Sequence, residues 1–462
     1  MENLAGYSAH QIAAGVRSRA FSRVEVVESH LAVIRRANPE VGALVVERAD
    51  GALAEAAAAD HAGADRGDLD GVPISVKAEY DVAGLPTSHG NSHFSSATAG
   101  SDSPVVERLR ARGAIVMGKG NQPDFAMRWN TFSSEGGWTR NPRDLSASAG
   151  GSSGGDAAAV AAGMVAIGFG TDLAGSIRVP AAFCGVYGLR STPGRIPFAS
   201  EDPLAVRSPA VEAFSSQGPF ARSVADLELA FSATAGPSTR HPFSSTARRH
   251  ESAARPMSRR VARVVDAAGA QVSAEMTAQV DLVCASLEEA GYEIEETSFE
   301  GIDRAPNLWG ELVSTDLRVN ALPHLAPLMD PSCLDHIEKL STQWPTARQT
   351  DQYLTLWTEW ARLRRAVLRW LASYPLVISP VSGFPGAPAL QYDHWVSSPD
   401  LLAITARMRN CLWVSCMGLP SLALPNGVQL IAAPHQDESL FSPAAIAEEA
   451  LPPCLPALVS AA

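Results

Sequence analysis

The sequence has few of the features that mark a metal-binding, disulfide-linked or nucleic-acid-binding protein. Its 462 residues contain only six cysteines, and no two of them form a Cys-x-x-Cys pair. Such scattered cysteines are typical of reduced, buried thiols, so we expect neither a metal site nor a cofactor. Basic residues are outnumbered, 37 against 49 acidic ones, which gives a net charge of −12. Nucleic acids and anionic membranes attract clustered basic residues, and we therefore expect neither as a partner.

Targeting signals and long apolar runs are also missing. The first ten residues, MENLAGYSAH, contain no basic stretch followed by an apolar one, as a signal peptide would. The least charged run, residues 157–171, is shorter than the roughly 20 apolar residues that a membrane helix needs. These absences predict a soluble protein located in the cytoplasm.

What the sequence does have is an alternation of helical and strand patterns. Capping boxes, such as Ser22 with Glu25, precede helical periodicity, and another helix is expected over residues 360–373. Short β-branched runs bounded by glycine or proline predict buried strands within residues 71–84, 114–117 and 374–380. Helices that alternate with buried strands indicate an α/β fold with a mainly parallel sheet.

Four glycines and two serines stand together in AGGSSGG, residues 149–155. A phosphate-binding loop is one interpretation, but a P-loop needs a lysine that is absent here, and the glycine spacing is not that of a dinucleotide-binding turn. A flexible linker is another, but patterned apolar segments follow at once. The small residues instead indicate backbone that must come close to another group.

A candidate nucleophile follows in GTDLAGSIR, where Ser176 comes after Ala174 and Gly175. Successive N–H groups on such a turn can converge on one oxygen and form an oxyanion hole. A serine at neutral pH needs a base. There is no G-x-S-x-G elbow, and no histidine is singled out by its placement. Lys77, at the end of the apolar stretch PISVK, is the candidate base, because burial lowers the pKa of an amine.

Five stretches, in this order and spacing, resemble the amidase signature family over about residues 70–230. They are GVPISVK (71–77), GAIVMGKGNQPDFA (113–126), TRNPRDLSASAGGSSGGDAAAVAAG (139–163), GTDLAGSIRVPAAFCGVYGLRSTPGR (170–195) and GPFARSVADLE (218–228). The resemblance implies one large domain, 1–462, with a mostly parallel mixed central sheet covered by helices on both faces. It also implies a helical, substrate-shaping region at about 260–420.

The same resemblance implies an activity and a catalytic set. The activity is hydrolysis of a small-molecule carboxamide to a carboxylate and ammonia or an amine, without a cofactor. Ser176 would be the nucleophile, Ser152 in a cis peptide would relay its proton, and Lys77 would be the final base. The backbone N–H groups of the oxyanion hole would be those of Leu173, Ala174, Gly175 and Ser176, and the supporting residues would be Ser153, Asp172 and Arg178. Many members of the family are homodimers, which favours a homodimer here.

The chain differs from the family's usual sequence motif at two positions near the site. Ala78 follows Lys77 where the family usually has Asp or Asn, and this removes a polar group beside the base. Ala174 stands where glycine is usual, which adds a methyl group at the oxyanion turn.

Aromatic and apolar residues outside the five stretches are candidates for the substrate pocket. Met127, Trp129 and Phe132, with Trp138, Trp309, Tyr353 and Trp357, suggest an apolar or aromatic acyl group, although core packing explains each of them equally well.

Two other functions remain open. The glutaminase subunit of the tRNA-dependent amidotransferase has the same fold and triad, and it works with a partner protein. No cluster that would bind the α-amino and α-carboxyl groups of glutamine stands out. A catalytically silent scaffold is the other, and the intact set of Lys77, Ser152 and Ser176 argues against it.

Overall fold

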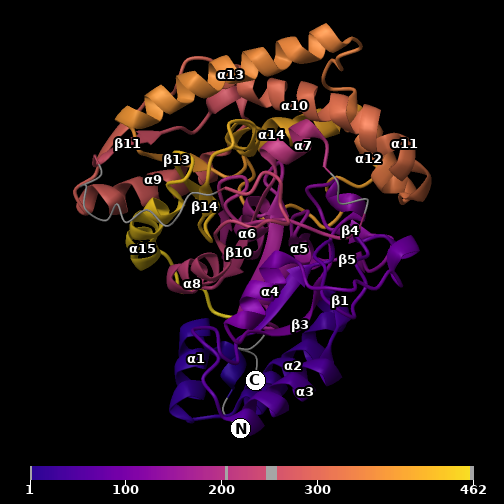
Figure 1. The fold of residues 1–462 in the computed structure, drawn as a ribbon. Helices are drawn as coiled ribbons and strands as arrows, with labels where there is room; N and C mark the ends of the chain where they lie inside the picture. The colour runs from indigo at the N-terminus through magenta and orange to yellow at the C-terminus, as the bar shows by residue number, and fades with distance from the viewer. Residues whose placement is uncertain (1–2, 203–206, 246–257, 458–462) are drawn as a thin grey trace.

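The computed structural model of the chain describes residues 3–202, 207–245 and 258–457. Within these residues an eleven-stranded sheet runs through the molecule in the order β1-β3-β2-β8-β10-β9-β14-β15-β13-β11-β12 (Figure 1). Its strands are β1 (Leu44–Glu47), β2 (Pro73–Lys77), β3 (Ile115–Gly120), β8 (Ile167–Asp172), β9 (Tyr187–Arg190), β10 (Ser216–Ala221), β11 (Arg260–Arg263), β12 (Glu293–Glu296), β13 (Leu376–Pro380), β14 (Ser421–Ala423) and β15 (Val428–Ala432). Two small two-stranded sheets lie outside it: β4 (Phe132–Ser133) with β5 (Gly137–Trp138), and β6 (Arg140–Asn141) with β7 (Asp144–Ser148).

The α-helices occur between the strands and at both ends of the described chain. They are α1 (Ala9–Ser18), α2 (Arg23–Val41), α3 (Ala49–Ala62), α4 (Pro104–Ala111), α5 (Gly154–Ala161), α6 (Arg178–Cys184), α7 (Pro209–Phe214), α8 (Val224–Thr234), α9 (Ala274–Glu289), α10 (Ala305–Asp316), α11 (Leu322–Leu325), α12 (Pro331–Ser341), α13 (Thr350–Ser373), α14 (Ser398–Cys416) and α15 (Phe441–Ala450). In Figure 1, α10 and α13 arch over one end of the molecule, and α1, α2 and α3 lie at the other.

The sheet separates two hydrophobic cores. Ile115 and Met117 belong to the core that includes residues of α2, α5, α10 and α14, whereas Val116 between them belongs to the core under α4, α8, α9 and α15. Successive side chains of a strand point to opposite faces, so both faces of the sheet are covered. The predicted α/β class, with helices on both faces of a mixed central sheet, is confirmed.

The expectation that most neighbouring strands are parallel is wrong. Of the ten neighbouring pairs in the described part of the sheet, six are antiparallel. β8 and β9 are joined through α6. However, β10 inserts between them and runs antiparallel to both. β14 and β15 are joined by a turn of only a few residues, which permits only an antiparallel pair. The apolar pattern of a segment predicts that it is buried, but it does not predict in which direction the neighbouring strand runs.

Most expected elements lie where the sequence places them. Ser22 makes the predicted capping box with Glu25 at the start of α2. The expected strands correspond to β2, β3 and β13. The helix expected over 360–373 starts earlier, at Thr350, and only Val367 and Leu371 on it are buried. Its first half carries too few buried apolar residues for the periodicity to be recognised.

None of the helices in the described residues has the length and apolar character that a bilayer crossing requires. The expected cytoplasmic location stays a prediction.

Candidate active site

Lys77 is the last residue of β2, at the carboxyl end of a buried strand. β2 lies between β3 and β8 and runs parallel to both, with Val76 opposite Phe169 of β8. The carboxyl ends of these three strands therefore meet at one edge of the sheet, where α/β proteins place their ligands. The Lys77 side chain is completely buried, despite its length and its amino group. A lysine in such a place needs polar partners, because burying an unpaired charge is costly.

Those partners come from the segment that follows β7 and from the end of β8. The Lys77 Nζ atom lies 2.7 Å from Ser152 Oγ and 2.8 Å from Thr171 Oγ1. The Gly151–Ser152 peptide bond is cis, as the family resemblance implies. Ser153 donates its backbone N–H to the Ser176 carbonyl at 3.1 Å, which joins the two serine-bearing loops. The structure thus brings Lys77, Ser152, Ser153 and Ser176 together.

Gly155 of the AGGSSGG stretch and Gly175 beside Ser176 allow the two serine-bearing loops to pack closely against their neighbours. A Cβ atom on Gly155, in the first turn of α5, would lie 2.1 Å from the backbone nitrogen of Asn121. Gly175 has a φ of +107°, a conformation that side chains disfavour, and a Cβ there would lie 2.8 Å from the sulfur of Cys411. The small residues are therefore required by packing at α5 and by backbone conformation beside Ser176.

Asp172 organises the loop that carries Ser176. Its carboxylate accepts bonds from the Gly175 N–H (2.8 Å) and from Arg178 Nε (2.9 Å), and it also pairs with Arg190. Burial alone would raise the pKa of this carboxyl, but the charges of Arg178 and Arg190 outweigh burial and hold its pKa well below the usual range. The Gly175 N–H is thus already engaged, and the candidate oxyanion donors narrow to Leu173, Ala174 and Ser176.

Two tryptophans hold the carbonyl side of the same loop. Trp129 donates its indole N–H to the Ala174 carbonyl at 2.9 Å, and Trp309 of α10 donates to the Leu173 carbonyl at 3.1 Å. In a trans peptide the N–H of the next residue points opposite to the carbonyl. The bond from Trp309 therefore directs the Ala174 N–H away from α10.

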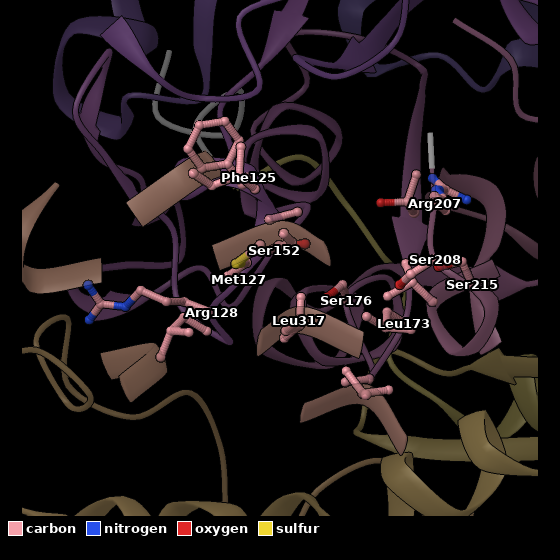
Figure 2. A pocket seen from close by; sticks show the side chains of 18 of the residues that line it. Phe125, Met127, Arg128, Ser152, Leu173, Ser176, Arg207, Ser208, Ser215 and Leu317 are labelled. Atoms are coloured by element: carbon pink, nitrogen blue, oxygen red, sulfur yellow. The ribbon is translucent and has the colours of Figure 1, made fainter. Parts of the chain in front are cut away.

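Ser152 and Ser176 line the same cavity, whose volume is about 330 Å³. Figure 2 shows Ser152 and Ser176 facing this space together with Met127, Leu173 and Leu317. Much of the lining is apolar and comes from several segments of the chain: Phe125, Met127, Trp129, Leu173, Phe198, Val211, Trp309, Val313, Leu317, Leu325, Ile337 and Leu340. Charged and titratable side chains contribute as well, among them Glu79, His89 and Arg207. The cavity combines room for an apolar group with a polar, reactive edge.

Of the seven pocket residues expected from the sequence, three line the cavity; the other four lie outside the described lining, Tyr353 and Trp357 of α13 among them. Met127, Trp129 and Trp309 line the cavity. The prediction for Phe132 is corrected, because among the described residues it does not belong to the cavity lining. Pairing of β4 with β5 turns its ring onto Trp138, with ring centroids 4.7 Å apart, and onto His394 at 5.1 Å. Trp138 belongs to that same aromatic cluster.

Two residues beside Lys77 were not found by sequence reasoning. Glu79 Oε1 lies 3.3 Å from Lys77 Nζ, and the Thr171 hydroxyl donates to the same carboxylate oxygen. Burial lowers the pKa of Lys77, and the negative charge of Glu79 partly offsets this shift. The available signal was an acidic residue two positions after a strand-end lysine, next to Ala78, where the usual polar residue is missing.

No group of three or more histidine, cysteine or acidic side chains within residues 3–202, 207–245 and 258–457 could hold a metal ion. The chemistry available at the site is that of two serines, a lysine and a carboxylate.

The fold and the site define a class: an α/β enzyme whose serines and buried lysine meet at one cavity, an arrangement suited to nucleophilic catalysis. Residues 25–441 match the model of the Amidase family, and the chain belongs to that family. It is an amide-hydrolysing enzyme.

Three relatives show how far the similarity extends. The chain is 32% identical to an indoleacetamide hydrolase of Bradyrhizobium diazoefficiens, across 96% of this chain and 86% of that protein. It is 43% identical to a glutamyl-tRNA(Gln) amidotransferase subunit of Anaeromyxobacter sp. (strain K), but across only 50% of this chain and 47% of that protein. The structure of 6-aminohexanoate cyclic dimer hydrolase superposes with a TM-score of 0.85 at 25% identity, covering 99% of this chain and all of that one.

Proposed function

We propose that the protein hydrolyses a carboxamide through an acyl-enzyme on Ser176, with Ser152 and Lys77 as the proton relay. The observation that carries this proposal is the 2.7 Å contact between Lys77 Nζ and Ser152 Oγ at a cavity that Ser176 also lines. A nucleophilic serine needs a base, and burial favours the neutral form of Lys77, which is the form that accepts a proton.

The relay moves protons in both directions. Ser176 Oγ forms a bond to the amide carbon while its proton passes to Ser152 Oγ, and Ser152 gives its own proton to Lys77 Nζ. The carbonyl oxygen becomes negative and is stabilised by N–H groups from among Leu173, Ala174 and Ser176. The tetrahedral adduct breaks its C–N bond, and the relay returns the proton to the departing ammonia or amine. Water then repeats the sequence and releases the carboxylate from Ser176.

The substrate class follows from the cavity. Its apolar and aromatic wall would exclude water from an aryl or bulky aliphatic acyl group. The similarity to an indoleacetamide hydrolase over 86% of that protein's length supports an arylacetamide in particular. A small arylacetamide also fits a cavity of about 330 Å³.

A panel of amides tests the proposal. Phenylacetamide, indole-3-acetamide, an anilide, hexanamide and glutamine are offered to the enzyme, and release of ammonia or aniline is measured. We expect turnover of the arylacetamides. Ser176→Ala, Ser152→Ala and Lys77→Ala should each lower kcat by roughly a thousandfold or more, because the relay works as a unit. A Ser176→Ala variant with full activity would contradict the proposed mechanism.

A glutaminase role within an amidotransferase is the second candidate, favoured by the 43% identity to the amidotransferase protein of Anaeromyxobacter. That match covers only half of this chain, and the cavity wall is largely apolar. If glutamine alone in the panel released ammonia, the amidotransferase role would replace the arylacetamide proposal.

A further inference from the structure

Glu79, Thr171 and Lys77 form a closed triangle next to Ser152. Lys77 Nζ lies 2.8 Å from Thr171 Oγ1 and 3.3 Å from Glu79 Oε1, and the Thr171 hydroxyl donates to that same Glu79 oxygen. Lys77 and Thr171 are buried, and the Glu79 side chain is only 12% exposed. Glu79 also lines the cavity.

The hydrogen-bond count of this triangle fixes the direction of the lysine lone pair. A neutral amine has two N–H donors and one lone pair, and an ionised carboxylate only accepts. Thr171 gives its hydroxyl hydrogen to Glu79, so its oxygen accepts from Lys77. Glu79 lies at ion-pair distance and can only accept, so in the neutral amine the second N–H turns to it. The lone pair is left for the third neighbour, the Ser152 hydroxyl, which is the group that must donate to it.

The carboxylate also acts through its charge. Burial alone would raise the pKa of Glu79, but the charge of protonated Lys77, the charge of Arg207 and the Thr171 hydrogen bond outweigh it and lower the pKa to about 2. When Lys77 is neutral, Arg207 and Thr171 still favour the ionised carboxylate. Its charge stabilises the ammonium that forms when Lys77 takes the proton. Among the described residues, the other charged or titratable groups facing this pair are Asp156 of α5, Arg207 before α7, Lys119 of β3, Tyr80 and His89.

Asp156 does not supply the same fixed charge as Glu79. It lies in α5, where its carboxylate accepts a bond from Ser75 at 2.6 Å. Burial raises its pKa to about 7, so it changes charge within the working range. Glu79 is thus the fixed negative charge in contact with Lys77.

We propose that Glu79 is a positioning residue of the catalytic base: with Thr171 it turns the Lys77 lone pair towards Ser152, and it sets the pH at which Lys77 begins to act. In this chain the carboxylate at position 79 supplies the polar partner that Ala78 lacks. The inference rests on the proposed function, because it assumes that Lys77 receives the proton.

The test follows the rate of covalent labelling of Ser176 by a fluorophosphonate between pH 5 and pH 10, and so needs no known substrate. In the wild type the rate rises with pH as Lys77 loses its proton. Glu79→Gln keeps the shape but removes the charge, so the rise should move to lower pH by on the order of one unit. The plateau rate should fall by about tenfold, because the amine becomes a weaker base.

Two variants act as controls. Glu79→Asp retains the charge and should restore most of the wild-type pH dependence. Glu212→Gln removes a negative charge from α7, close to the cavity residue Val211 but bonded to His241, and should leave the pH dependence unchanged. If Glu79→Gln fails to fold in a thermal melt, Glu79→Asp becomes the test, because its retracted carboxylate should give a smaller shift in the same direction.

The outcomes separate the inference from the proposed function. A rise that stays in place in Glu79→Gln, or moves to higher pH, overturns the role of Glu79. A wild type that is never labelled on Ser176, or a Lys77→Ala variant labelled as fast as wild type at every pH, overturns the proposed relay itself.

Discussion

Asp172 shows how one buried residue can shape the loop that carries Ser176. Its side chain and those of Arg178 and Arg190 are completely buried. Its carboxylate also accepts the N–H groups of Gly175 and Ile177. The loop that ends in Ser176 is therefore wound around a buried ion cluster.

Asp172→Asn should destabilise the protein, because it leaves two guanidinium groups in the interior without a counter-charge. We expect a loss of about 3 kcal/mol or more in the free energy of unfolding. The matched control is Asp65→Asn, whose partner Arg17 is about half exposed (52%), and which should change little. Urea unfolding measures the free energy of unfolding of both variants. Equal losses would show that the buried ion cluster stabilises the protein no more than the exposed pair does.

At the scale of elements, α5 is a fully buried helix that begins directly after Ser152 and Ser153. All eight of its residues, Gly154–Ala161, are buried, and its start carries Ser152 and Ser153 to Lys77. Gly155→Ala places a Cβ 2.1 Å from the Asn121 nitrogen and 2.5 Å from the Ala43 carbonyl, neither of which can move freely.

We expect Gly155→Ala to cost about 3 kcal/mol of stability, at the upper end of the overpacking range. Ala157→Gly, in the same helix, should cost only about 1 kcal/mol, the usual difference in helix propensity plus a small cavity. Thermal melts of the two variants measure the difference. A Gly155→Ala protein as stable as Ala157→Gly would mean that α5 is free to shift away from the sheet.

The link between α10 and the serine loop makes a second prediction at this scale. Trp309→Phe keeps an aromatic ring but removes the donor to the Leu173 carbonyl, so the Leu173–Ala174 peptide, whose N–H is a candidate oxyanion donor, loses a bond that fixes its orientation. The rate of the chemical step should fall about tenfold, which is a partial loss of one oxyanion donor. Trp357→Phe, on α13, lies outside this loop and packs on Phe214 and Trp360, and it should leave the rate unchanged. Single-turnover kinetics with the best amide of the panel would detect the difference.

Some strands and site residues could be predicted from the sequence, and others could not. Lys77, Ser152 and Ser176 could be predicted because each lies in a short motif of its own, and β2, β3 and β13 because their apolar runs are compact. The antiparallel insertion of β10 could not be predicted, since strand pairing depends on contacts far apart in the chain. Glu79 was missed because its signal, an acidic residue two positions after Lys77, does not distinguish a carboxylate that contacts Lys77 from one that points to solvent.

At the scale of the whole molecule, buried titratable groups have opposing effects on acid stability. Burial lowers the pKa of His30 to about 3 and that of His336 to about 4. Burial raises the pKa of Asp156 to about 7 and that of Asp437 to about 6. Below about pH 6.5 the unfolded chain binds protons on histidines that the folded protein keeps neutral, which favours unfolding. The folded protein meanwhile binds protons on the two acids, which opposes this loss.

The variant His30→Gln isolates the contribution of one buried histidine to acid stability. His30 has its Nδ1 atom 3.2 Å from the Met164 carbonyl, a bond that a glutamine can also make. The stability that neutral His30 contributes is present above pH 6.5 and is lost as the pH falls towards 3. The stability advantage of the wild type over His30→Gln should therefore shrink by about 2 kcal/mol between pH 7 and pH 5. Urea unfolding at the two pH values checks this, and an unchanged gap would mean that His30 is charged in the folded protein.

The central claim is that Lys77, through Ser152, activates Ser176. The most direct measurement is the intact mass of the protein after treatment with a fluorophosphonate at pH 8, followed by mapping of the modified peptide, in the wild type and in Lys77→Ala. The account predicts one adduct, on Ser176, in the wild type, and almost none in Lys77→Ala at the same exposure. An adduct on another residue, or equal labelling of the two proteins, would contradict it.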